Sequence, residues 1–290
     1  MKLQHIAAAV ALAAVGSANA AIATGGNGSM VLIAYDKLGG TTTAGVFDLG
    51  LTLDDFVGST GNGTALSSTA LHTKNISWDL VNNTITVGGS VTSFGGSNNW
   101  TAAWNTLLAN SDAADLSFVV TAFDTVGVAA NQRSLVTGSP TSTATFLSGQ
   151  ASGLQAIAGG KPQDIFQPLT SKGTIASAAN GAYTFTAADG AATRANGYAM
   201  AGDAFGNEWR SNNVLGGETL ASKSTALYLV DGATKKAIAG GAATPGVLRL
   251  DASTGVLSYT VSAVPEPSTY AMLVAGLVVA GAAARRRRAA

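Results

Sequence analysis

Short apolar runs recur along this chain, and in several of them hydrophobic and polar residues alternate. In 75–80 and 183–186 every second residue is apolar, the pattern of a strand with one buried face and one solvated face. Gly- and Asn-rich segments separate the runs, as in all-β chains with many turns. We therefore predict an all-β, jelly-roll-like β-sandwich. Its expected strands are 29–35, 45–49, 75–80, 84–87, 116–123, 134–136, 182–186, 226–230, 247–250 and 256–261.

Two segments have the pattern of short helices. Residues 99–110 place apolar side chains at offsets 0, 4, 7 and 8, which predicts an amphipathic helix that begins after an asparagine cap. These apolar residues are Trp100, Trp104, Leu107 and Leu108. Residues 54–56 predict a helical turn. We expect both to cover a sheet face or a sandwich end.

Turn residues predict how the strands connect. Asn82-Asn83 and the segment 251–255 have the composition of hairpin connections. The last hairpin, 247–261, has no sheet of its own, so we expect it to pair with earlier strands in one domain. Between 137 and 192 strand character fades, which leaves open a domain boundary or a long loop with a helix near 146–157.

Residues 1–20 have the pattern of a secretory signal peptide. Lys2 precedes an apolar run, 6–15, and the small residues of Ala18-Asn19-Ala20 fit a signal peptidase site. We expect the mature protein to begin at Ala21, with an N-terminal anchor as the alternative.

The segment 264–290 contains a proline-rich turn, an uncharged apolar run and four arginines. A helix over about 270–284 would be about 22 Å long, against a hydrocarbon core of about 30 Å, so it predicts a marginal transmembrane anchor. The arginine cluster, which keeps its end of such a helix cytoplasmic, is Arg285, Arg286, Arg287 and Arg288. The alternative is a buried helix with a solvated or nucleic-acid-binding tail, but the apolar run directly abuts the arginines.

These elements, with the triplet Pro265-Glu266-Pro267 ahead of the helix, resemble the PEP-CTERM sorting signal of Gram-negative bacteria. The resemblance implies that an exosortase, an integral-membrane enzyme, recognises Pro265, Glu266 and Pro267, cuts nearby and passes the protein to the cell surface. It also implies an association with exopolysaccharide. It covers some 25 of 290 residues and is silent on the chemistry of 21–263.

Charge and cysteine content exclude several classes of site. Without Lys2 and the four arginines, 11 of the 16 basic residues remain; without Glu266, 15 of the 16 acidic residues remain. Residues 21–264 thus carry a net charge of −4, which does not favour nucleic acid as a partner. The chain has no cysteine, so disulfides and thiolate sites are excluded.

Catalytic groups are sparse in 21–263. His72 is the only histidine after signal removal, so a catalytic triad would need it, and we expect a surface or strand-edge histidine instead. A carboxylate pair around Glu208 would be required for glycoside hydrolysis, whereas an ordinary loop ion pair is the simpler interpretation. We expect no cofactor, with a structural calcium ion as an open alternative that has no nameable ligands.

Aromatic residues offer one candidate glycan contact. The patterns place Trp78, Trp100 and Trp104 in the core and leave Trp209 available to stack on a sugar. The leading hypothesis is a non-enzymatic surface or matrix protein, anchored in the inner membrane before processing by an exosortase. The alternative is a secreted carbohydrate-active enzyme or glycan-binding adhesin with the same sorting tail.

Overall fold

The computed structural model describes residues 27–36, 43–58, 69–93, 99–123, 133–138, 181–186, 219–220, 224–231, 234–237 and 246–261. Most of them lie in strands, which confirms the all-β class. The strands are β1 Ser29–Asp36, β2 Ala44–Thr52, β3 Ile76–Asp79, β4 Thr84–Val87, β5 Ser90–Ser93, β6 Leu116–Phe123, β7 Arg133–Gly138, β8 Ala182–Phe185, β9 Thr219–Leu220, β10 Ser224–Asp231, β11 Thr234–Ala237, β12 Val247–Asp251 and β13 Val256–Thr260. The helical segments are α2 Leu53–Val57, η1 Leu71–Thr73 and α3 Asn99–Ala109.

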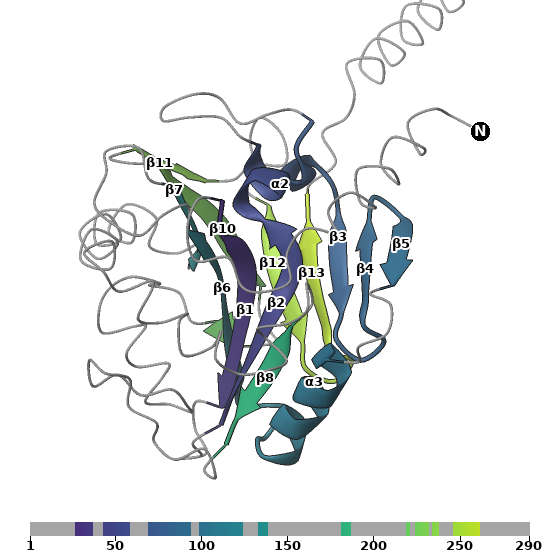
Figure 1. Cartoon of the computed structure of the whole chain (residues 1–290). Coiled ribbons are helices and arrows are strands. Elements are labelled where there is room, and N and C mark those ends of the chain that lie inside the picture. Colours follow the sequence, from purple (N-terminus) through teal and green to yellow (C-terminus); the bar gives the residue numbers. More distant parts are fainter. Residues whose placement is uncertain are drawn as a thin grey trace, which may run out of the picture.

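The strands form one hydrogen-bonded path in the order β5-β4-β3-β13-β12-β10-β7-β6-β1-β2-β8, with β11 beside β10 and β9 beside β6. Figure 1 shows the path bent into two layers, with β3, β4, β5, β12 and β13 in one and β1, β2, β6, β7 and β10 in the other. The layers face each other, since the indole Nε1 of Trp78 on β3 donates to the carbonyl of Leu49 on β2 at 3.0 Å. The last hairpin pairs with β3 and β10, as predicted. These pairings do not establish a jelly-roll order.

The two layers differ in their outer faces. Burial alternates along β3 and β4, so Ile76 and Trp78 point inward while Ser77 and Asp79 are partly exposed. In β2, by contrast, all nine residues are buried. Side chains on both faces of β1, β2 and β6 are buried, at 3% exposure or less for Val31, Leu32, Ile33, Val46, Phe47, Asp48, Phe118 and Val119. The layer that contains β1, β2 and β6 is therefore an internal sheet.

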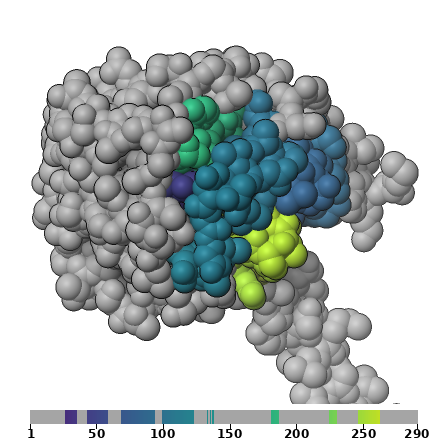
Figure 2. Space-filling view, turned by 90° about the horizontal axis from the view of Figure 1, so that it is seen from below, coloured from purple at the N-terminus to yellow at the C-terminus, as the bar shows by residue number. Residues whose placement is uncertain are grey.

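Helix α3 covers one end of the core, and its position confirms the predicted amphipathic face. Trp100, Trp104 and Leu107 are buried, and Leu108 packs at the margin of the core. Figure 2 shows the teal segment that contains α3 between β8 in green and the β12–β13 hairpin in yellow. The hydroxyl of Thr184 on β8 donates to the carbonyl of Ala103 at 2.6 Å, which fixes the helix to the sheet.

Both predicted hairpins form, and an aspartate organises each turn. Asp79 accepts from the backbone nitrogens of Val81 and Asn82 in the β3–β4 turn. Asp251 accepts from the backbone nitrogens of Ser253 and Thr254 in the β12–β13 turn. Gly255 has φ +70°, and a Cβ there would lie 2.7 Å from a methyl of Val81, so the second turn needs glycine.

The predicted strands and helices agree with the observed bounds to within three residues. The sequence pattern missed β5, β9 and β11, which are short or polar and carry no apolar alternation. The signal segment 1–20, the sorting segment 264–290 and the helix near 146–157 lie outside the described residues. The division into 1–20, 21–263 and 264–290 stays a prediction.

Candidate functional site

The residues that the sequence marks for sorting lie outside the part of the chain that the structure describes. These are Pro265, Glu266 and Pro267 of the motif and the arginine cluster 285–288. The candidate glycan contact Trp209 and its neighbour Glu208 also lie outside the described residues. The remaining candidates can be placed. Their positions show which contacts the polar and aromatic side chains make within the described part of the protein.

His72 is buried at 3% exposure, so the predicted surface or strand-edge position is wrong. It lies in the 3-10 turn η1, which packs against α2, and its ring is edge-on to Phe56 with centroids 6.4 Å apart. Its Nδ1 bonds the carbonyl of Phe56 at 3.1 Å, and its own carbonyl accepts from the hydroxyl of Tyr259 at 2.9 Å. Burial lowers the pKa of His72, and the bond to Phe56 partly opposes this shift. A neutral ring that bonds a backbone carbonyl is a structural arrangement.

The three described tryptophans are core residues, as predicted. Trp78, Trp100 and Trp104 are at most 1% exposed. The indoles of Trp78 and Trp100 donate to the carbonyls of Leu49 and Asp48, at 3.0 and 2.9 Å. None of these three presents a ring face to solvent, so among the sequence candidates for sugar stacking only Trp209 is left.

The acidic pair before Phe56 is also engaged in structure. Asp55 and Thr52 form a capping box that begins α2, with the hydroxyl of Thr52 donating to Asp55 at 2.7 Å. Asp54 pairs with Arg133 of β7, whose guanidinium also donates to the carbonyl of Gly58 at 2.6 Å. These contacts fasten α2 to the second layer. Among the described residues no group of three His, Cys, Asp or Glu side chains could hold a metal ion.

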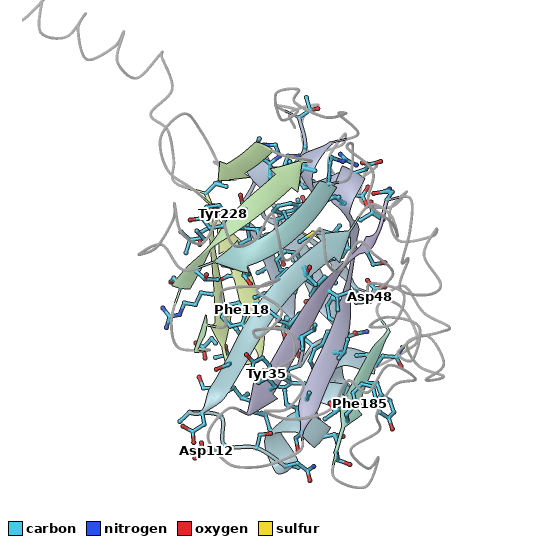
Figure 3. All side chains as sticks on the ribbon, turned by 90° about the vertical axis from the view of Figure 1, so that its left-hand side faces the viewer. Tyr35, Asp48, Asp112, Phe118, Phe185 and Tyr228 are labelled. Carbon is cyan, nitrogen blue, oxygen red and sulfur yellow. The ribbon has the colours of Figure 1, made fainter. Side chains whose placement is uncertain are left out.

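A carboxyl group that the sequence analysis did not single out has the most unusual surroundings. Asp48 lies within β2 at 1% exposure, and Figure 3 shows it beside strand β1. Its Oδ1 accepts from the backbone nitrogen of Gly50 at 2.9 Å, and the Ser29 side chain also hydrogen-bonds the carboxyl. Its Oδ2 is buried without a hydrogen-bond partner. Burial raises the pKa of Asp48 to about 8, against the lowering effect of these two bonds, so the group is mostly neutral at pH 7.

The backbone of Asp48 joins three further elements. Its nitrogen donates to the carbonyl of Gly181, just before β8, at 2.8 Å. Its carbonyl accepts from Trp100 of α3. One buried acid therefore lies where β1, β2, β8 and α3 meet. In the sequence, Asp48 falls on the non-core side of an alternating strand, and an aspartate in that position is ordinarily solvated.

No helix within the described residues is long and apolar enough to cross a membrane. Comparison with known proteins identifies one feature of the chain: residues 263–288 match the family model of the PEP-CTERM protein-sorting motif. No curated protein and no solved structure matches the chain. The candidate functional site is therefore the C-terminal motif, and Asp48 is a second, separate feature of the folded body.

Proposed function

From the PEP-CTERM protein-sorting motif that residues 263–288 of this chain carry, we propose that it is an exported surface or matrix protein processed by an exosortase. The matched range includes the triplet Pro265-Glu266-Pro267, the apolar run and the arginines. In this proposal these residues are recognised by the processing enzyme and take no chemical part themselves. The match to the motif is the observation that carries the proposal.

The tail has the physical properties that transient anchoring needs. An uncharged run of about 15 residues satisfies its backbone hydrogen bonds as a helix and enters hydrocarbon, although at about 22 Å it is short for a full span. The arginines 285–288 stop transfer and stay in the cytoplasm. A short span holds the precursor in the inner membrane until cleavage near the triplet frees the folded body.

The mass of the mature C-terminus tests the sorting proposal. In cells with the exosortase we expect an end close to Pro267 and loss of the arginines 285–288. In cells without the enzyme, or in Glu266→Ala, we expect the arginines to be retained. Glu218→Ala is the matched control, a glutamate outside the motif whose variant should be processed normally. A wild-type protein that keeps its arginines where the enzyme is present would contradict the proposal.

Topology gives a second, independent test. A reporter enzyme fused after Ala290 should be active in the cytoplasm, because the arginine cluster keeps that end inside. Activity confined to the periplasm would refute the anchored precursor. This result does not depend on whether the host carries an exosortase.

We propose further that the folded body is not an enzyme and associates with exopolysaccharide. Its described histidine, its acidic pair in α2 and three of its tryptophans are used for burial, capping and hydrogen bonds within the fold, which supports a structural role. Incubating the purified protein with candidate polysaccharides should yield retention and no new reducing ends. New reducing ends would favour the alternative, a secreted carbohydrate-active enzyme.

A glycan-binding adhesin is the remaining alternative, and Trp209 is its candidate contact. The sequence surrounds it with Asn207, Glu208 and Arg210, groups that hydrogen-bond sugar hydroxyls. Saturable binding that falls in Trp209→Ala and is kept in Trp209→Phe would support this contact. Equal binding by all three proteins would exclude it.

A further inference from the structure

Asp48 has three properties that are not usually found together in a buried acidic residue. It is 1% exposed, one of its carboxyl oxygens has no hydrogen-bond partner, and its backbone joins β8 and α3 to β2. A buried polar atom without a partner is costly, and a buried charge without a partner costs more. The protonation state of the Asp48 carboxyl should therefore change the stability of the junction between β1, β2, β8 and α3.

We propose that Asp48 is a proton-linked latch: its neutral form holds β1, β2, β8 and α3 together, and its ionised form loosens this junction. The inference goes beyond the proposed function, because no sorting residue takes part in it. The latch belongs to the internal sheet, where water does not reach the carboxyl.

No cation in the surrounding described elements would stabilise the ionised form. The described elements packed against β2 include β1, β3, β8, α2 and α3, and none of these five contains Lys, Arg or His. Their titratable residues are Tyr35, Asp36, Asp54, Asp55, Asp79 and Tyr183. None of these residues supplies a positive charge. Arg133, on β7, is already bonded to Asp54 and to the carbonyl of Gly58.

The hydrogen bonds that do reach the carboxyl are too few for a carboxylate. The backbone nitrogen of Gly50 donates to Oδ1, and the Ser29 side chain hydrogen-bonds the carboxyl. Oδ2 has no hydrogen-bond partner. Two neutral donors lower the pKa, but burial outweighs them and raises it to about 8. In the unfolded chain an aspartate has an ordinary pKa of about 3.9.

The sign of the effect follows from proton counts. Between these two values the folded state binds a proton that the unfolded state lacks, so stability falls as pH rises. The loss amounts to about tenfold in the unfolding constant per pH unit and levels off above about 8. Because an unfolded histidine titrates near 6.5, His72 changes the unfolding constant by no more than about twofold between pH 6.5 and 8, in the direction opposite to Asp48.

The test is denaturant unfolding of the full chain in mild detergent at several pH values from 6.5 to 9. For the wild type we expect the unfolding constant to rise roughly tenfold between pH 6.5 and 8, because Asp48 is already half ionised in the folded state at pH 8. Asp48→Asn keeps an oxygen acceptor for Gly50 and cannot ionise, so its unfolding constant should not rise and should change by no more than about twofold, through His72. Asp112→Asn is the matched control: Asp112 is an exposed turn aspartate whose Oδ1 accepts from Ala114, and this variant should follow the wild type.

If Asp48→Asn folds poorly, infrared spectroscopy of the wild type measures the protonation state of the Asp48 carboxyl directly. The infrared spectrum of folded wild type should show a protonated carboxyl band at pH 6.5 that is lost by pH 9. A wild type with no such band, or an unfolding constant that is level between pH 6.5 and 8, would overturn the latch. Equal slopes in wild type and Asp48→Asn would also overturn it.

Discussion

The hydroxyl of Tyr259 makes one long-range contact whose removal tests how the last strand is fixed. It donates to the carbonyl of His72 at 2.9 Å, a bond between β13 and η1 across 187 positions of the chain. The ring of Tyr259 also lies edge-on to Phe56 at 5.0 Å between centroids. Tyr259→Phe removes the hydroxyl and keeps the ring, so it isolates the hydrogen bond.

The expected loss follows from the burial of both partners. Tyr259 is 1% exposed and His72 3%, so the carbonyl loses its donor where water does not easily replace it. A neutral hydrogen bond contributes about 0.5–1.5 kcal/mol, and an unsatisfied buried acceptor adds to the loss. We expect about 1–2 kcal/mol less free energy of unfolding. For a domain of this size that corresponds to about 2–8 °C in Tm.

Denaturant unfolding at pH 7.5 measures this loss as a lower midpoint with an unchanged slope. Burial raises the pKa of the Tyr259 hydroxyl, so it remains a donor throughout the accessible pH range. Tyr259→Leu, which also loses the contact with Phe56, should unfold more easily than Tyr259→Phe. A change below about 0.3 kcal/mol in Tyr259→Phe would show that the carbonyl finds another partner and that the reasoning is wrong.

Three further variants test other contacts by the same unfolding assay. In Asp48→Asn, where the opposing titration of Asp48 is absent, stability should fall as pH drops below about 6.5, because burial lowers the pKa of His72 and the unfolded chain gains a proton first; adding His72→Asn should remove this acid dependence. Arg133→Leu should lower the free energy of unfolding by about 1–3 kcal/mol, since it removes the bonds to Asp54 and to the Gly58 carbonyl. If this loss is no larger than that of Asp54→Asn, the bond to the Gly58 carbonyl does not contribute. Gly246→Ala should destabilise more than Tyr259→Phe, because a Cβ there would overlap the Tyr259 ring; wild-type stability would contradict this.

Alternation and turn chemistry were sufficient to predict the layer that faces solvent. In β3 the inward residues are apolar and the outward residues polar, and β13 follows the same period of two except at Val256, which is apolar and partly exposed. Trp100 and Trp104 carried the helical period in the same way. The two turns were predicted from Asn82-Asn83 and from the segment 251–255, whereas the role of Asp79 in the first turn was not predicted.

The burial of both faces of the internal sheet could not be predicted from the same pattern, for a physical reason. Alternation tells which residues share a face, but it does not tell whether the second face is also covered. Asp48 follows Phe47 and precedes Leu49, so it falls on the face opposite the core and appears solvated from sequence alone. Only the burial of both faces of β2 in the folded protein, with Asp48 at 1% exposure, places it in an interior. His72 was misjudged similarly, since polar neighbours in the sequence gave no sign that η1 turns the ring beneath Phe56.

The position of the last strand makes folding and sorting physically separable. β13 is hydrogen-bonded on both sides, to β12 and to β3, and just after it the backbone nitrogen of Val261 donates to Asn75 at 2.9 Å. Pro265 follows four positions later. Cleavage near the Pro-Glu-Pro triplet therefore cuts beyond these described hydrogen bonds of β13, and the strand keeps its partners. Loss of the latch at Asp48 would consequently change the stability of the body without changing the C-terminal mass, while loss of Glu266 would do the reverse.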